Sequence, residues 1–218
     1  LLFATGAPES LVMTSGNRSR EPIAVDDEDA YRRLGEIADA FLVGERRIAR
    51  RVDDSVAQAT SLGTMMVRRS RGYAPGTVAR LRCEQPVLAV GGDQKNTVAL
   101  AIAGGVMVSQ HLGDLEYHDT RTAFEHTIRD FLDLYHVDAS HLIVAHDGHP
   151  QYVSTRHALE IPAAQHVSVQ HHRAHVASVL AERDAVATRV VGAAFDGSGF
   201  GDDGTIWGGE FFVGRVVG

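Results

Sequence analysis

The second half of the chain alternates short apolar runs with amphipathic segments. Two β-rich runs, "TVALAIA" and "VMVSQHL", flank Gly104-Gly105, and this pattern predicts a tight hairpin. Apolar residues return with helical spacing between Asp119 and His136, which predicts a helix. The runs "PVLAV", "HLIVAHD", "QHVSVQ" and "RVVGAAFDGSG" are typical of strands. Strands that alternate with helices predict an α/β fold with a largely parallel sheet, and ligands bind at the carboxyl ends of such strands.

The first part of the chain has a weaker pattern. The apolar run Leu11 to Met13 predicts a strand, the polar stretch "TSGNRSREP" a loop, and the segment from Asp26 to Phe41 a helix. Residues 68–86 are basic and contain glycine and two prolines, so we expect a linker or a basic loop there. The chain therefore divides into two blocks, of which the second begins at Val87.

Composition excludes several classes of protein. The 218 residues are 44% hydrophobic and 22% charged, as in ordinary globular proteins of one or two domains. A net charge of -7 does not favour nucleic acid as a partner. Cys83 is the only cysteine, which excludes a disulfide framework and a cysteine-based zinc finger within these residues. No apolar run is long enough to cross a membrane and no signal-peptide pattern begins the chain, so we expect a cytoplasmic protein.

The stretch "SVQHHRAHVAS" suggests a metal site. His171 and His175 are four residues apart, so on a helix both rings would lie on one face and could share an ion. A pair of surface histidines is the alternative on spacing alone. Because two histidines do not complete a metal shell, a carboxylate is needed, and Asp196 at the end of an apolar run is the candidate. His172 would point about 100° away, so we expect its replacement to have little effect.

Two glycine-containing stretches are candidates for binding phosphate. In "FDGSGFGDDGTIWGGE", glycines at 197, 199 and 201 could turn backbone N–H groups toward an anion, although a plain glycine-rich hairpin fits as well. The neighbouring aspartates would repel bare phosphate unless a cation lay between them, which suggests a metal together with a nucleotide. In "VGGDQKNT", Lys95 and Thr97 could contact phosphate and Asp93 could lie near the water shell of the metal, but a simple turn is equally compatible.

Three further stretches carry candidate side chains. In the loop "MTSGNRSREPI", Ser15 and Asn17 could bond phosphate oxygens, and the loop could also cap the following helix. Ser55 in "RRVDDSV" occupies a similar polar position before a strand. In "DGHPQYVSTRHA", side chains could line a cleft, or the stretch could simply connect a strand to a helix; these side chains are Asp147, His149, Tyr152 and Arg156.

Eight motifs in one order resemble the HypF family of hydrogenase-maturation carbamoyltransferases. They are "MTSGNRSREPIA", "DDSV", "RRSRGYAP", "LAVGGDQKNT", "SQHLGDLE", "DGHPQYVSTRHA", "VQHHRAHVAS" and "DGSGFGDDGTIWGGE". The resemblance implies an internal fragment: residues 1–81 would end a YrdC-like α/β domain, 82–86 would be a linker, and 87–218 would be the first half of a Kae1-like domain. The Kae1-like domain has the nucleotide-binding fold of actin, Hsp70 and sugar kinases. The family's acylphosphatase and zinc-finger modules, with their zinc, would lie upstream.

The resemblance also implies an activity. The family uses ATP, expected with Mg²⁺, and carbamoyl phosphate to make carbamoyl adenylate, and transfers the carbamoyl group to the C-terminal cysteine of the partner protein HypE. Adenylate would form at residues such as Ser15, Asn17 and Ser55. Transfer would take place over a divalent metal (iron, zinc or manganese) held by His171, His175 and Asp196. The last carboxylate ligand would lie beyond residue 218, and the piece would be inactive alone.

The sequence departs from the family pattern in three places. "GERRI" stands where the family often has "HNRPI", Ala57-Gln58 stand where an arginine is usual, and Arg173 replaces the third of three histidines.

Three other functions are alternatives to a HypF-type carbamoyltransferase. An O-carbamoyltransferase of small-molecule biosynthesis would have the two modules in the opposite order. A non-catalytic nucleotide-binding switch would not need the histidine pair. A threonylcarbamoyl-transfer protein for tRNA is disfavoured by the acidic charge and by "DGTIWGGE".

Overall fold

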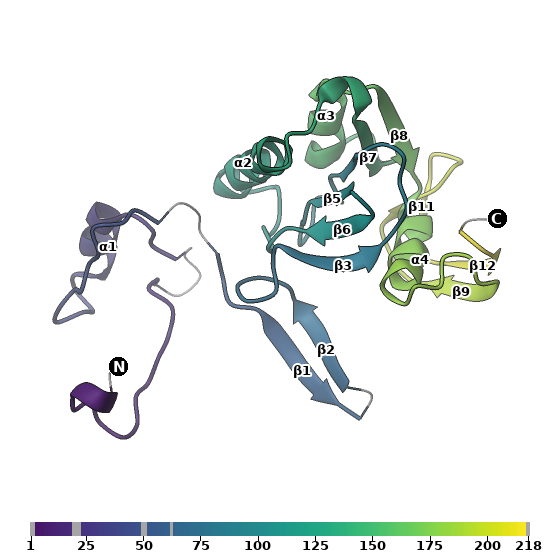
Figure 1. Cartoon of the computed structure of the whole chain (residues 1–218). Coiled ribbons are helices and arrows are strands. Elements are labelled where there is room, and N and C mark those ends of the chain that lie inside the picture. The colour runs from purple at the N-terminus through teal and green to yellow at the C-terminus, as the bar shows by residue number, and fades with distance from the viewer. Residues whose placement is uncertain (1–2, 19–22, 49–51, 62, 217–218) are drawn as a thin grey trace. The chain divides into compact units, whose positions relative to one another are not determined.

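The computed structural model describes residues 3–18, 23–48, 52–61 and 63–216. The chain divides into two compact units, Leu1–Asp53 and Asp54–Gly218, and each is described by itself (Figure 1). None of the described helices is long and apolar enough to cross a membrane.

Among its described residues, the first unit contains a short 3-10 helix, η1 (Phe3–Thr5), and one α-helix, α1 (Asp27–Leu34). Helix α1 begins where the carboxylate of Asp26 accepts a hydrogen bond from the backbone N–H of Asp29 at 3.2 Å. It ends before Gly35, a poor helix former, and so is shorter than the predicted helix from Asp26 to Phe41. The strand predicted at Leu11 to Met13 is wrong: this run is irregular and exposed, because it pairs with no described segment.

A six-stranded sheet organises the second unit, in the order β3-β6-β5-β4-β7-β8. Its strands are β3 (Gly76–Arg80), β4 (Val87–Ala89), β5 (Ala99–Ile102), β6 (Gly105–Val108), β7 (Ile143–Asp147) and β8 (Gln165–Val169). Only β4, β7 and β8 run parallel, so the expectation of a largely parallel sheet is wrong. The reason lies in the connections, because parallel neighbours need long crossovers whereas β5 and β6 are joined by a tight turn.

The hairpin between β5 and β6 confirms the turn predicted from the glycine pair, shifted by one residue. The two turn residues are Ala103 and Gly104, with φ angles of 52° and 80°. Positive φ at both central positions is the geometry that joins twisted antiparallel strands most closely. A separate hairpin is formed by β1 (Val56–Thr60) and β2 (Gly63–Arg68).

Strand β3 lies inside residues 68–86, where the composition predicts a linker or a loop. It pairs antiparallel with β6 and forms one edge of the sheet. The run from Gly76 to Arg80 contains Thr77 and Val78, which are β-branched and favour extended backbone. Edge pairing with a neighbouring strand thus gives order to a segment whose glycine, proline and charge content suggested none.

The core lies where two helices cover one face of this sheet. Leu88, Leu100 and Val144 stand opposite one another on adjacent strands and are fully buried. Helix α2 (His118–Leu134) contributes Phe124 and Phe131, which confirms the predicted apolar face. Helix α3 (Val153–Glu160) packs beside it, and a short 3-10 helix, η2 (Ala139–His141), precedes β7.

The chain after β8 builds the region that carries the candidate metal ligands. Helix α4 (His171–Glu182) follows β8 directly and packs on β9 (Val190–Ala194), which pairs antiparallel with β12 (Glu210–Gly214). In the sequence between β9 and β12, β10 (Gly199–Phe200) and β11 (Ile206–Trp207) form a small hairpin. This arrangement brings the first turn of α4 against the loop that follows β9.

We expect Phe124→Ala to destabilise the second unit by about 3–5 kcal/mol, because it leaves a cavity in a core that cannot collapse freely. Glu125→Ala, on the exposed side of the same helix, should change stability by less than about 0.5 kcal/mol. Urea unfolding followed by circular dichroism measures both. Equal effects of the two variants would contradict the placement of α2 against the sheet.

Candidate metal centre

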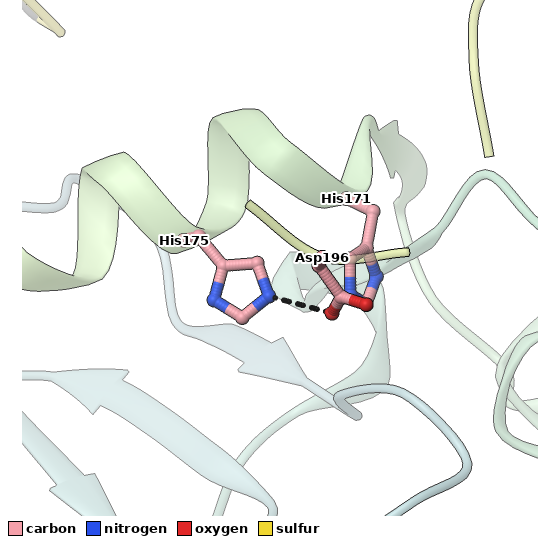
Figure 2. Close-up of side chains that lie close together, drawn as sticks. All are labelled: His171, His175 and Asp196. Atoms are coloured by element: carbon pink, nitrogen blue, oxygen red, sulfur yellow. Dashed lines mark hydrogen bonds and ion pairs between the residues drawn. The ribbon is translucent and has the colours of Figure 1, made fainter. Parts of the chain in front are cut away.

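Three side chains predicted as metal ligands lie together beside α4. His171 and His175 project from the same side of the helix, one turn apart, toward Asp196 (Figure 2). The Nε2 atom of His171 lies 2.9 Å from Asp196 Oδ2, and the Nε2 atom of His175 lies 3.2 Å from the same oxygen. One ligand atom from each residue can be chosen so that all three lie within 4.8 Å of one another.

A second carboxylate orients His171 from behind. Asp147, the last residue of β7, places Oδ2 2.6 Å from His171 Nδ1, and its Oδ1 accepts the backbone N–H of His149 at 2.7 Å. The Asp147 side chain is only 7% exposed, so little water competes for this contact. A carboxylate on Nδ1 fixes the ring and leaves Nε2 as the atom directed at Asp196, as in many metal sites.

These contacts change the proton affinities of two groups. The hydrogen bond that His171 donates to Asp147, opposed by burial and assisted by Asp196, raises the pKa of His171 above its usual 6.5. Burial alone would raise the pKa of Asp196, but the hydrogen bonds from His171 and His175 outweigh it and hold this pKa well below its usual range. Asp196 is therefore an anion at neutral pH, and the site has the negative charge that a cation requires.

The donor set fits a divalent transition metal. Two imidazole nitrogens and one carboxylate oxygen suit zinc, iron or manganese. His175 is 53% exposed and Asp196 32%, so one side of the group is open for a further ligand or a substrate. The group lies after the carboxyl ends of β7 and β8, which is the edge of a parallel arrangement where ligands bind.

Close packing explains glycine at two of the three positions that were predicted to bind phosphate. A Cβ at Gly199 would lie 2.3 Å from His172 Nε2, and one at Gly201 would lie 2.3 Å from the Trp207 ring. Both glycines are buried against these rings. Gly197 is exposed and has no such neighbour, so close packing accounts for two of the three predicted glycines.

The other predicted nucleotide-binding residues have contacts of their own. Ser15 and Asn17 belong to the first unit, where the Ser15 hydroxyl donates to Asn17 Oδ1, and residues 19–22 of the same loop lie outside the described residues. Ser55 belongs to the second unit and holds the backbone of Ser70 and Arg71 at 2.8 and 2.9 Å. Lys95 is exposed, with a φ of 49°.

Asp93, expected near the water shell of a metal, has a different contact. Its two carboxylate oxygens accept the backbone N–H groups of Val153 and Ser154, at 2.9 and 3.0 Å, and so cap the N-terminus of α3. The distance in sequence between Asp93 and the helix hid this contact.

A cavity of about 440 Å³ lies near the metal group. Tyr152 and His149 line it, and their rings stack with centroids 4.3 Å apart, as expected for a cleft formed by this stretch. Ser198, from the loop that carries Asp196, lines it as well. Burial and the carboxylates of Asp147, Asp93 and Asp196 raise the pKa of Tyr152, so its hydroxyl stays protonated and can donate a hydrogen bond into the cavity.

Sequence reasoning missed the surroundings of His172. As predicted, its ring does not take part in the metal group, but it is completely buried between Glu210 and the backbone of Asp196. We therefore expect its replacement to lower stability, because a fully buried hydrogen-bonded side chain contributes to stability. The sequence pattern alone did not indicate this effect. The acid in "WGGE" was the only signal in the sequence, and nothing there linked it to a histidine 38 residues earlier.

Comparison with known proteins agrees with this architecture. A family model described as "HypF Kae1-like domain" matches residues 82–182, and a Sua5/YciO/YrdC model described as "Telomere recombination" matches residues 1–70. "Carbamoyltransferase HypF" of Synechocystis is 45% identical over 202 residues, and "Carbamoyltransferase HypF2" of Cupriavidus necator is 42% identical over 232. These alignments cover 92% and 98% of this chain but only 26% and 28% of the two relatives.

Solved structures show the same likeness. A crystal structure of full-length HypF in a phosphate- and nucleotide-bound form has a TM-score of 0.82 and 39% identity, and covers 93% of this chain and 32% of that one. HypF of T. kodakarensis has a TM-score of 0.78 and 35% identity, and covers 93% and 26%. The chain thus joins part of a YrdC-type domain to part of a Kae1-like domain. It belongs to the HypF carbamoyltransferase family.

We expect Asp147→Asn to weaken zinc binding about 10–100-fold, because the carboxylate that orients His171 is lost. The matched control is Asp138→Asn, which alters an exposed aspartate 3.4 Å from His141 and should leave zinc affinity unchanged. Titration against a chelator of known affinity measures both. Equal zinc affinity in the wild type and the Asp147 variant would show that His171 does not need this partner.

Zinc affinity should also fall with acid. Below the raised pKa of His171, a proton occupies Nε2 and competes with the metal, so affinity decreases by about tenfold per pH unit for each proton displaced. In Asp147→Asn the first cause of the raised pKa is gone, so the decrease should begin at a lower pH than in the wild type. Chelator titrations between pH 5.5 and 8.5 test this, and identical onsets would contradict it.

Proposed function

We propose that this chain takes part in ATP-dependent carbamoyl transfer of the HypF type. In this reaction hydrolysis of carbamoyl phosphate gives phosphate and carbamate, and the carbamate reacts with ATP to form carbamoyl adenylate and pyrophosphate. The carbamoyl group then passes to the C-terminal cysteine of HypE, and AMP leaves. The observation that carries the proposal is the convergence of His171, His175 and Asp196 in a member of the HypF family. Because the chain spans about a quarter of its relatives' length, the proposal concerns the complete polypeptide.

The proposal assigns the two half-reactions to different parts of the chain. Residues 1–81 belong to the YrdC-like part and 87–218 to the Kae1-like part, with a linker at 82–86. Adenylate formation uses the hydroxyl- and amide-bearing side chains Ser15, Asn17 and Ser55. Carbamoyl transfer takes place beside His171, His175 and Asp196, with phosphate contacts from Lys95 and from the exposed backbone at Gly197. The N–H groups of Gly199 and Gly201, also expected to bind phosphate, instead donate to the carbonyl oxygens of Asp196 and Thr205.

The arrangement of the Kae1-like part supports a transfer step. His171 and His175 direct Nε2 toward one carboxylate oxygen, and the group is open on one side. A divalent metal bound there would supply polarisation of the carbamoyl carbonyl and of the departing adenylate. Tyr152 keeps its phenolic proton at neutral pH and can donate it as a hydrogen bond to a substrate oxygen in the adjoining cavity.

Separate assays of the two half-reactions in the complete polypeptide test the proposal. Asn17→Ala should slow carbamoyl-phosphate-dependent exchange between ATP and pyrophosphate by roughly tenfold or more, because a hydrogen bond to a charged group is worth about 1.5–3 kcal/mol. His175→Ala should keep this exchange but lose transfer to HypE, read as a missing mass increase on the HypE cysteine.

Two control variants set the baseline for these assays. Glu9→Ala in the first unit and His141→Ala in the second alter exposed side chains outside the proposed sites and should change neither half-reaction. Loss of exchange in His175→Ala would contradict the division between the two parts. Full transfer in that variant would contradict the role of the metal group.

A further inference from the structure

His172 joins two parts of the fold that carry metal ligands. Its ring is completely buried, although it lies in the first turn of α4 between residues that are at least partly exposed. The Nε2 atom lies 2.9 Å from the carbonyl oxygen of Asp196, and Nδ1 lies 2.8 Å from Glu210 Oε2 on β12. The ring therefore bridges α4, the loop after β9, and β12.

The chemistry of the two partners fixes the direction of the first bond. A carbonyl oxygen can only accept, so Nε2 of His172 carries a hydrogen and donates it to the Asp196 backbone. The proton between Nδ1 and Glu210 holds the ring from the other side. The same Glu210 oxygen accepts a hydrogen bond from Gln170 Nε2 at 2.7 Å. Since a buried polar ring with an unmet hydrogen bond is costly, both contacts are strongly favoured.

Glu210 and Gln170 extend this bridge to the helix start. The side-chain oxygen of Gln170 accepts the backbone N–H of Arg173 at 2.9 Å and so caps α4. Gly199 brings the loop against the ring, because a Cβ there would lie 2.3 Å from His172 Nε2. The glycine-rich segment after β9 is thus tied to the helical turn that carries His171.

The consequence concerns the geometry of the metal group. Asp196 presents Oδ2 to both His171 and His175, and that position depends on where its own backbone lies. Gly197 and Gly199 follow Asp196, and glycine increases the backbone freedom that folding must remove. The hydrogen bond from His172 to the Asp196 carbonyl removes this freedom at the ligand itself.

We propose that His172 and Glu210 are positioning residues that hold the Asp196 backbone at the distance from α4 required for metal binding. The inference rests on the metal site proposed above. It gives the middle histidine of "HHRAH" and the acid of "WGGE" one shared role, in which neither side chain touches the metal. The role depends on the Nε2 donor in particular, and this makes it separable from a general effect on stability.

Two amides that mimic one ring nitrogen each provide the test. The side-chain nitrogen of glutamine can take the place of Nε2, whereas that of asparagine takes the place of Nδ1. In the complete polypeptide, His172→Gln should therefore keep Co²⁺ affinity within a few-fold of the wild type, and His172→Asn should lose tenfold or more. The visible absorption of bound Co²⁺ reports its coordination, so His172→Asn should also change that spectrum.

Control variants separate position from stability. Ile128→Ala removes a buried side chain from the core under α2 and should lower stability without changing Co²⁺ affinity. Glu210→Gln, whose side chain is 19% exposed and can tolerate an amide, should weaken Co²⁺ binding and alter its spectrum even if both His172 variants fail to fold. An unchanged affinity and spectrum in Glu210→Gln would overturn the inference.

The remaining outcomes distinguish this inference from the proposal on which it rests. If the wild type binds no Co²⁺, or if His171→Ala binds it equally well, the metal site itself is wrong. If His171→Ala loses Co²⁺ while the glutamine and asparagine variants both match the wild type, only the positioning role is wrong. If Ile128→Ala loses affinity as much as His172→Asn does, the effect follows stability alone and the positioning role is also overturned.

Discussion

The packing of the first turn of α4 against the loop after β9 is the constraint on which the candidate site depends. His171 and His175 come from the helix and Asp196 from the loop, so the three ligand atoms meet only if these two backbones are held together. The contacts that hold them are not made by the ligands alone. The buried ring of His172 reaches the Asp196 carbonyl, and Gly199 leaves room for that ring.

The mixed sheet places the contact between α4 and the loop after β9 at the edge of the sheet where ligands bind. Strands β4, β7 and β8 run parallel, so Asp93, Asp147 and His171 all lie at or just after their carboxyl ends, at one edge. Each has a separate task there, because Asp93 caps α3, Asp147 orients His171, and His171 faces Asp196. The antiparallel strands β5, β6 and β3 extend the sheet on the other side and complete the core against α2. The sheet thus supports a site whose residues come from strand ends and from the segments that connect the strands.

The same contacts relate the site to acid–base chemistry. His171 lies between two carboxylates, which raises its pKa, whereas Asp196 accepts from two imidazoles, which lowers its own. A group with this charge pattern attracts a divalent cation and exchanges protons for it. Tyr152, nearby and surrounded by the same carboxylates, keeps its proton. The carbamoyl transfer proposed for the complete polypeptide is a reaction in which such a combination would be useful.

The sequence by itself determined the features that depend on local spacing. The four-residue interval of His171 and His175, the apolar face of Phe124 and Phe131, and the hairpin at Gly104 follow from helical or strand periodicity, which neighbours in the sequence define. Only the tertiary structure decided the antiparallel edge strand β3, the capping of α3 by Asp93, and the burial of His172 against Glu210. Each of these joins residues far apart in the sequence, and a periodic pattern carries no information about which distant backbone or side chain will be its partner.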